Sequence, residues 1–186
     1  MELDLTGKFL IAMPGMLDPR FDHAVVYMCS HDDDGAMGLI INKPAPGVRF
    51  VELLGQLGID HSPDTPDIRV HIGGPVETER GFVLHTLDYR SEAATLDLAD
   101  GIGLTATLDI LTDLGAGEGP ERALLALGYA GWGAGQLEAE LAQNAWITAP
   151  ATPDAVFGRA HDLKWAGALK SIGVDPRLLT GEGGRA

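Results

Sequence analysis

The sequence has a single cysteine, Cys29, among 186 residues, so no disulfide can form within the chain. Basic residues are also few, since 13 Lys and Arg stand against 27 Asp and Glu and give a formal net charge of −14. Proteins that bind nucleic acids draw most of their affinity from Lys and Arg side chains that neutralise phosphates. Because the basic residues here are scattered and form no run, we expect no direct binding to DNA or RNA.

Long apolar runs are absent as well. No stretch approaches the roughly 20 apolar residues that a helix needs to cross a bilayer. The first residues, MELD, are acidic and lack the basic, apolar and small-residue order of a secretory signal. We therefore expect a cytoplasmic protein that does not associate with membranes.

The familiar catalytic and metal-binding motifs are missing too. The sequence contains no Gly-x-Ser-x-Gly, His-Glu-x-x-His, Walker or Cys-x-x-Cys pattern. The histidines are dispersed along the chain, and no serine stands in the context of a nucleophile. We therefore expect no catalytic residue, no cofactor and no metal site, and the sequence does not favour an enzyme.

The apolar residues that are present suffice for one core. Hydrophobic residues make up 45% of the chain, an ordinary share for a globular protein, and the length is that of one domain. We expect residues 1–186 to form a single domain, with a disordered tail at residues 181–186.

Short apolar runs between turn residues predict several strands. Runs at residues 24–30 and 36–42 are joined by Asp34-Gly35, which is a strong hairpin signal. Both alternations of these runs are apolar, so we expect both faces of the sheet to be covered. Further strands are predicted at residues 8–13, 69–72, 81–86, 95–98, 102–106, 123–129 and 146–148.

Helices are fewer and mostly late in the chain. Phe50, Leu53, Leu54 and Leu57 have the i, i+3, i+4, i+7 spacing of an amphipathic helix. Strands joined by hairpins dominate the first 106 residues, so we predict an α+β fold with a mixed, largely antiparallel sheet and a few flanking helices. The later helices are predicted around residues 110–114, 137–145 and 165–172, with a turn at residues 131–135.

Three local patterns have both a functional and a structural interpretation. Cys29 and His31 are two residues apart on a predicted strand and so share a face, but zinc would need two more ligands, and we favour a buried cysteine. Residues 101–106 match Gly-x-Gly-x-x-Ala, yet they are predicted as a strand where the dinucleotide motif requires a helix. His71 and His85 lie on predicted strands and can approach each other only if those strands are close.

Six residues beside glycine-rich segments form the candidate ligand or partner patch. The neighbouring glycines permit a close approach of the backbone to a ligand. A composite binding site would require the six side chains to converge on one pocket. They are Asn42, Lys43, Arg80, His85, Trp132 and Gln136.

Four ordered segments of the chain resemble a known family. They are residues 12–14 with Asp18 and Phe21, residues 35–39 with 42–44, residues 73–76 with 80–85, and residues 128–132 with 135–138, Glu140, Asn144 and Trp146. This order resembles that of the bacterial AlgH/YqgE family from about Leu10 to the end. The resemblance implies a compact fold with a bent sheet closed into a pseudo-barrel. It implies no established activity and no catalytic or metal-binding residues, although members are often labelled transcriptional regulators.

The function expected from these observations is non-enzymatic. The leading hypothesis is a cytosolic binding or regulatory protein that acts through an unidentified protein or small-molecule partner. One alternative is an enzyme or nucleotide-binding module whose site is assembled from distant strands. A second alternative is a direct DNA-binding transcriptional regulator, which the net charge of −14 disfavours.

Overall fold

A computed structural model describes residues 3–16, 18–91 and 94–179 of the chain. The tail predicted to be disordered, residues 181–186, lies outside these ranges. The strands are β1 (Lys8–Ala12), β2 (Val25–Asp32), β3 (Gly35–Ile40), β4 (Pro44–Arg49), β5 (Arg69–Ile72), β6 (Val76–Thr86), β7 (Thr95–Ala99), β8 (Ile102–Thr105), β9 (Ala123–Gly133) and β10 (Trp146–Pro150). The helices are α1 (Phe50–Gln56), α2 (Leu108–Gly115), α3 (Gln136–Ala142), α4 (Pro153–Phe157) and α5 (Lys164–Ser171), with short 3-10 turns η1 (Pro19–Phe21), η2 (His161–Leu163) and η3 (Pro176–Leu178).

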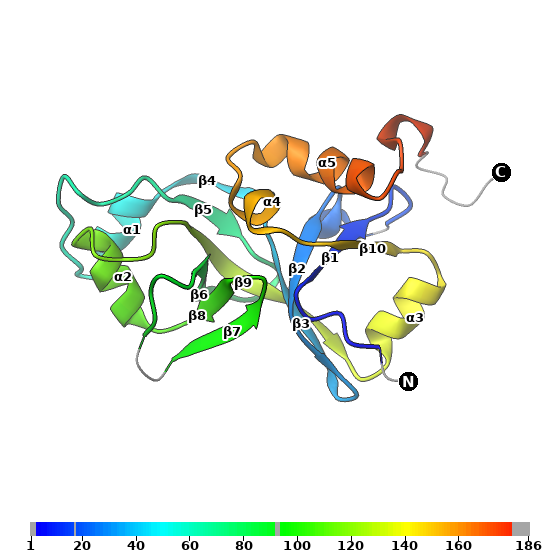
Figure 1. The fold of residues 1–186 in the computed structure, drawn as a ribbon, viewed down its shortest axis with the longest axis horizontal. Coiled ribbons are helices and arrows are strands. Elements are labelled where there is room, and N and C mark those ends of the chain that lie inside the picture. Colours follow the sequence, from blue (N-terminus) through cyan, green and yellow to red (C-terminus); the bar gives the residue numbers. More distant parts are fainter. Residues whose placement is uncertain (1–2, 17, 92–93, 180–186) are drawn as a thin grey trace.

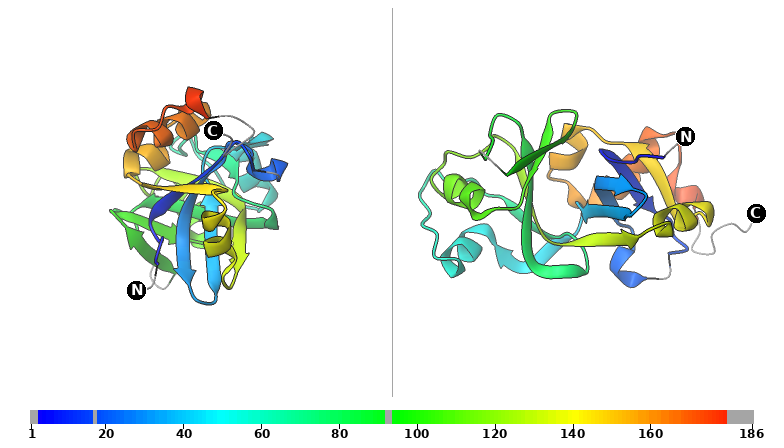
Figure 2. Two further views of the ribbon diagram at one scale, coloured as in Figure 1. Left: turned by 90° about the vertical axis from the view of Figure 1, so that its right-hand side faces the viewer. Right: turned by 90° about the horizontal axis from the view of Figure 1, so that it is seen from below.

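The strands form one curled sheet in the order β10-β1-β2-β3-β9-β6-β8-β7, with β5 joined to β9 and β4 joined to β5. Among the described strands, only β5 and β9 pair in parallel. The sheet bends into a half-barrel with helices packed on both of its faces (Figures 1 and 2). The predicted α+β fold, with a mixed and largely antiparallel bent sheet in a pseudo-barrel, is therefore confirmed.

Strand β9 is the element that connects the two ends of the molecule. Its first half pairs with β5 and β6, and its last residues pair with β3. One lobe therefore holds β4 to β8 with α1 and α2, and the other holds β1, β2, β3 and β10 with α3 and α5 (Figure 1). Because β9 is long enough to pair with strands of both lobes, the two lobes share a single sheet.

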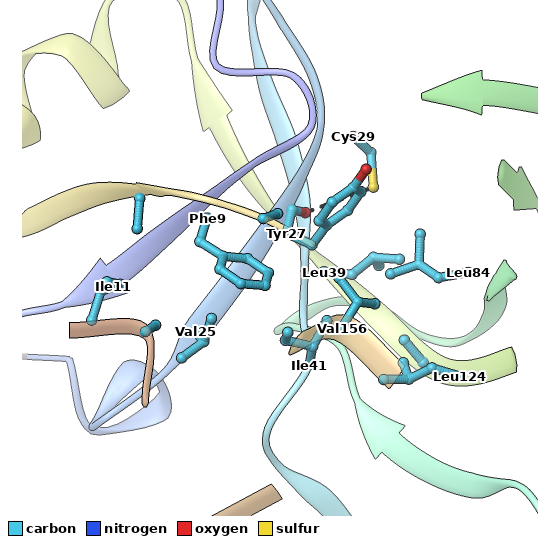
Figure 3. Close-up of a cluster of buried hydrophobic side chains, with 14 of the residues drawn as sticks. Phe9, Ile11, Val25, Tyr27, Cys29, Leu39, Ile41, Leu84, Leu124 and Val156 are labelled. Atoms are coloured by element: carbon cyan, nitrogen blue, oxygen red, sulfur yellow. Dashed lines mark hydrogen bonds between the residues drawn. The ribbon is translucent and has the colours of Figure 1, made fainter. Parts of the chain in front are cut away.

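Both faces of the sheet are covered, as the apolar alternation predicts. Along β2, Val25, Tyr27 and Cys29 belong to one buried cluster, which α4 and α5 cover (Figure 3). Val26 and Met28 point to the other face, in a second cluster that includes Leu137 of α3. A third cluster packs α1 and α2 against β5, β6 and β9.

Three glycines allow β9 to cross the loop between β5 and β6. Gly128 has a φ of +76°, and a Cβ there would overlap the carbonyl oxygen of Gly74. In turn, a Cβ on Gly74 would overlap the backbone of Tyr129, and one on Gly73 would overlap the carbonyl oxygen of Gly128. Backbone contact therefore requires glycine at positions 73 and 74.

Three details of the sequence prediction are wrong. Residues 44–49, for which no strand was predicted, form β4; among the described strands β4 pairs only with β5, and an edge position tolerates proline. Residues 131–133 continue β9 instead of forming a turn, because they pair with β3. Cys29 and His31 do not share a face, because the pairing of β2 with β3 shifts register between Met28 and Ser30, and such a bulge reverses the alternation.

Two hairpins of the sheet turn at Asp-Gly pairs, whereas β6 begins at Val76, before the strand predicted at residues 81–86. The Asp34-Gly35 hairpin joins β2 to β3, and Asp100 and Gly101, with φ of +53° and +78°, turn β7 into β8. The residues that match Gly-x-Gly-x-x-Ala lie in β8 and its turn, so no helix opens there. None of the helices in the described ranges is long and apolar enough to cross a membrane.

Candidate functional site

The six residues of the predicted patch do not converge on one pocket. Trp132 and Gln136 line one open cleft, and Trp132 also lines a neighbouring depression beside Arg80. Asn42, Lys43 and His85 line neither of these cavities. None of these cavities in the described part of the chain is therefore lined by all six residues.

The three residues outside these cavities have structural contacts. Asn42 accepts a hydrogen bond from the Val25 amide (2.9 Å) and donates one to the His23 carbonyl (2.8 Å). Lys43 donates to the Asp22 carbonyl over 2.6 Å, so both side chains hold the segment before β2. His85 is fully buried, with its Nε2 at 2.8 Å from the Thr105 hydroxyl.

Arg80 lies in a shallow surface depression. Its guanidinium stands 4.9 Å above the ring centre of Phe82 and 3.7 Å from the carboxylate of Glu77. Exposed pairs of this kind contribute little to stability. Arg80 shares this depression with one face of Trp132.

The larger cavity is the indole cleft, of about 850 Å³. It lies between the segment after β1, the end of β9, α3 and the start of β10. Its apolar wall combines buried indoles with exposed edge residues. The wall residues are Met13, Met16, Phe21, Val76, Trp132, Trp146, Leu178 and Leu179.

A single carboxylate organises the indole cleft. Glu140 Oε1 accepts hydrogen bonds from the indole nitrogens of Trp132 (3.1 Å) and Trp146 (2.9 Å), and Oε2 accepts from the Gln136 amide (2.9 Å). The two indoles are only 7% and 3% exposed, so their donors need an internal acceptor. Charged acceptors make stronger hydrogen bonds than neutral ones, and Glu140 therefore fixes both rings.

The local sequence explains how these groups meet. Trp132 lies at the end of β9, where alternation turns it to the second buried cluster. Gly135, with a φ of +74°, turns the chain into α3, and Gln136 Oε1 accepts from the Gly133 amide over 3.0 Å. Glu140 follows Gln136 by one helical turn and thus faces the same side.

A second cavity, of about 230 Å³, lies on a different set of residues. We call it the cationic cavity, because Arg69, Arg122 and Arg159 line it together with His71 and His161. It forms where β5 and the start of β9 meet the segment around α4 and η2. It shares no lining residue with the indole cleft.

Two histidines meet directly in the cationic cavity. Nε2 of His71 lies 3.0 Å from Nδ1 of His161, and Nδ1 of His71 lies 3.2 Å from the Arg69 carbonyl. Burial, together with the charges of His161 and Lys164, lowers the pKa of His71 to about 3. Burial followed by the charges of Lys164 and Arg69 lowers the pKa of His161 to about 4. Both imidazoles are therefore neutral at pH 7.

The charge of Lys164 acts on both of these histidines and lowers their pKa values. Its Nζ donates to the carbonyls of Ile41 (3.0 Å) and Val156 (2.7 Å), and burial lowers its pKa to about 8. The ion pairs of the described residues include neither Lys164 nor Arg69 nor Arg159.

The arrangement offers little for nucleophilic or metal chemistry. Cys29 is 3% exposed, and burial raises the pKa of its thiol to about 12, so it carries no thiolate at neutral pH. No group of three or more metal-ligating side chains occurs within the described ranges.

The sequence prediction missed the cationic cavity and half of the indole cleft. His71 approaches His161, and not His85, because β5 lies beside β9 with the α4–η2 segment above it. One signal was present: Arg159, His161 and Lys164 place three basic side chains within six residues of an acidic chain. For Glu140, the fourth family-like segment contained the residue, but nothing indicated that two indoles would share it.

Comparison with known proteins gives consistent matches over almost the whole chain. A family model described as AlgH-like matches residues 9–177. A UPF0301 protein of Jannaschia sp. (strain CCS1) is 56% identical over 185 residues, which are 98% of this chain and 96% of the relative. A UPF0301 protein of Rhodospirillum rubrum is 52% identical over 182 residues, which are 98% of this chain and 94% of the relative.

Solved structures match the fold. The solution structure of the AlgH protein from Pseudomonas aeruginosa has a TM-score of 0.80 and 43% identity, with 100% of both chains covered. A crystal structure of a Corynebacterium diphtheriae protein has a TM-score of 0.72 and covers 91% of this chain and 87% of its own. At 20% identity, this second likeness shows the fold alone.

Proposed function

The chain belongs to the AlgH-like family, and on that premise we propose that it is a non-enzymatic binding or regulatory protein whose protein partner docks in the indole cleft. The membership confirms the resemblance drawn from the four sequence segments. The observation that carries the proposal is the pair of indoles fixed by one carboxylate inside an open cleft of about 850 Å³.

The edge of the cleft suits an apolar side chain. Val76 and Leu178 are 37% and 79% exposed, and they flank the buried wall formed by Trp132 and Trp146. Exposed apolar groups beside a preorganised aromatic pocket are typical of protein interaction sites, where aromatic residues carry much of the binding energy.

The charges of the cleft favour a partner with a basic group next to its apolar side chain. The charged lining residues are Asp18, Arg20 and Glu140, and Arg20 already pairs with Asp18 over 2.7 Å. Glu140 keeps a negative charge that its three neutral donors do not cancel. The net charge of −14 adds long-range attraction for a basic partner, which salt will screen. Regulation would then act through a protein and not through direct contact with DNA.

Affinity capture with a matched control tests the proposal. The immobilised full-length protein is compared with a Val76→Ser, Leu178→Ser double variant, which changes only exposed side chains at the cleft edge. Leu96→Ser, on β7 outside the cleft and 54% exposed, is the control. We expect a bacterial protein to be retained by the wild type and the control, to be lost by the double variant, and to bind less at high salt. Equal retention by the double variant contradicts the proposal.

The indole signals provide the second measurement. When the captured partner is added to the ¹⁵N-labelled protein, the indole N–H resonances of Trp132 and Trp146 should shift. Trp165, whose Nε1 donates to the Ala12 carbonyl over 2.8 Å outside the cleft, is the internal reference. A shift confined to Trp165, turnover of a metabolite, or tight retention of duplex DNA would each rule out this function.

A further inference from the structure

We propose that the cationic cavity binds a small oxyanion of the phosphate class, held by Arg69, Arg159 and His161. This site is independent of the partner-binding function, because it shares no lining residue with the indole cleft. Its ligand would be inorganic phosphate or a small phosphomonoester.

The first argument is the gathering of positive charge in a strongly acidic chain. Three arginines line the cavity, against the carboxylates of Asp67 and Glu121. Arg122 is engaged by Asp154 over 2.8 Å, and its guanidinium stands 5.5 Å from the Phe157 ring centre. Arg69 and Arg159 take part in none of the ion pairs found among the described residues. Two guanidinium groups are therefore available to an anion at the mouth of the cavity.

The second argument is the positive charge buried behind the imidazoles. Among the residues that the structure describes, Lys164 hydrogen-bonds to two neutral carbonyls, those of Ile41 and Val156. A cation that is partly removed from water is stabilised by a compensating negative charge, and the charge of Lys164 acts on both histidines that line the cationic cavity. Burial is the main cause of the low pKa values of both histidines, and the charges of Lys164 and Arg69 lower them further; these two positive charges would also attract an anion.

The hydrogen-bonding groups also suit an oxyanion. The planar guanidinium binds phosphate oxygens through two parallel N–H bonds, which an ammonium cannot do. His71 uses Nδ1 toward the Arg69 carbonyl and Nε2 toward His161. Neutral His161 donates its one N–H, at Nδ1, to His71, so its Nε2 can donate to an anion only after it takes up a proton. A bound anion favours that protonation, because it offsets the charges of Lys164 and Arg69. We therefore expect anion binding to raise the pKa of His161.

A metal ion fits this cavity poorly. The two imidazole nitrogens that would be ligands are already hydrogen-bonded to each other at 3.0 Å. Lys164 and Arg69 would repel a divalent cation, and no third ligating side chain joins the two histidines among the residues that the structure describes. A volume of about 230 Å³ is also below the roughly 300–1,000 Å³ of sites for drug-sized ligands, so a nucleotide is not expected.

NMR titration of the ¹⁵N-labelled full-length protein tests the proposal. The probes are inorganic phosphate, glycerol phosphate and succinate, each at the same ionic strength. We expect the imidazole signals of His71 and His161 to shift and to saturate with the two phosphates, while succinate has no saturable effect. Tighter binding of glycerol phosphate would identify a phosphomonoester as the ligand, and equal or weaker binding would identify free phosphate. The signals of Trp132 and Trp146 should not move, which separates this result from the test of the indole cleft.

Two variants decide whether the arginines hold the anion. Arg69 and Arg159 are exposed, so Arg69→Gln and Arg159→Gln should fold normally. Each should weaken phosphate binding by about tenfold, the loss expected for one charge-assisted hydrogen bond. Arg90→Gln, which removes an exposed arginine paired with Asp97 elsewhere, is the control and should bind as the wild type does. The proposal is wrong if the shifts never saturate, if succinate saturates them equally, or if both arginine variants bind phosphate as the wild type does. The histidine pair would then have a structural role only.

Discussion

His71 and His161 lie 90 residues apart in the chain and share a hydrogen bond of 3.0 Å between Nε2 and Nδ1. The bond ties the parallel strand β5 to the segment that leads into α5. His71 is 1% exposed, so the pair can be formed without cost only while the imidazole of His71 is neutral. The contact therefore couples the docking of the C-terminal segment to pH.

The first prediction concerns this coupling. The pKa of His71 falls from about 6.5 to about 3 on folding, so between these values the unfolded chain binds a proton that the folded protein does not. The free energy of unfolding should thus fall as the pH drops below 6.5, by about 2 kcal/mol for this one group at pH 5. His71→Phe should remove that part of the pH dependence. Urea unfolding at pH 7, 6 and 5 measures it.

Between pH 7 and pH 5, the contribution of the histidines to the pH dependence of stability can be measured apart from that of the carboxyl groups. The carboxyl groups with lowered pKa values, such as Asp88 and Asp109, lose their contribution only below their ordinary value of 3.8. His61→Phe, at an exposed position, is the control and should leave the profile unchanged. A His71→Phe variant that keeps the wild-type slope would show that another group carries the pH dependence.

The second prediction concerns Glu140. Removing its carboxylate in Glu140→Ala leaves the indole donors of Trp132 and Trp146 buried without an acceptor, so the free energy of unfolding should fall by about 3 kcal/mol. Glu140→Gln keeps one acceptor oxygen and should cost about 1 kcal/mol. Gln143→Ala, an exposed position in the same cleft, should stay within about 0.5 kcal/mol of the wild type. Urea unfolding followed by tryptophan fluorescence gives all three values, and equal losses in the two Glu140 variants would contradict this role.

Much of the fold was predictable because its signals are local. The Asp34-Gly35 turn fixed one hairpin, and the apolar spacing of α1 fixed an amphipathic helix. The length of β9 was not predictable, because Gly131 and Gly133 are turn residues by composition and become strand residues only through pairing with β3. Tertiary contact overrode local preference at that point.

The candidate site was less predictable, since its contacts are long-range. Trp132 and Gln136 were found because they stand together beside glycines in the sequence. The bond between His71 and His161 depends on the parallel pairing of β5 with β9, for which no local signal exists. Asn42 and His85 were predicted as ligand-binding residues because they are polar and lie near glycines or on strands. In the structure Asn42 hydrogen-bonds to the backbone, and His85 hydrogen-bonds to the Thr105 hydroxyl.

The third prediction tests the crossing of β9 over the β5–β6 loop. Gly74→Ala would place a Cβ into the backbone of Tyr129, which cannot move without breaking the sheet, so we expect a loss of about 3 kcal/mol or more, or failure to fold. Gly55→Ala is the matched control: its Cβ would meet nothing within 4 Å in the last turn of α1, and it should stabilise the protein by about 0.5 kcal/mol. Thermal unfolding monitored by circular dichroism compares the two. A Gly74→Ala variant as stable as Gly55→Ala would refute the crossing.

The fourth prediction concerns the hydroxyl of Tyr27, at the centre of the largest buried cluster (Figure 3). It is the buried side-chain polar atom for which the described residues supply no hydrogen-bond partner, so its desolvation is uncompensated. Tyr27→Phe keeps the ring and removes that atom, and it should raise the free energy of unfolding by about 1 kcal/mol. Tyr89→Phe is the opposite case, because the Tyr89 hydroxyl donates to Asp113 over 2.6 Å, and it should lower the free energy by a similar amount. Urea unfolding of both variants should give opposite signs, and a loss of stability in Tyr27→Phe would mean that the hydroxyl is hydrogen-bonded in solution, for instance to a buried water.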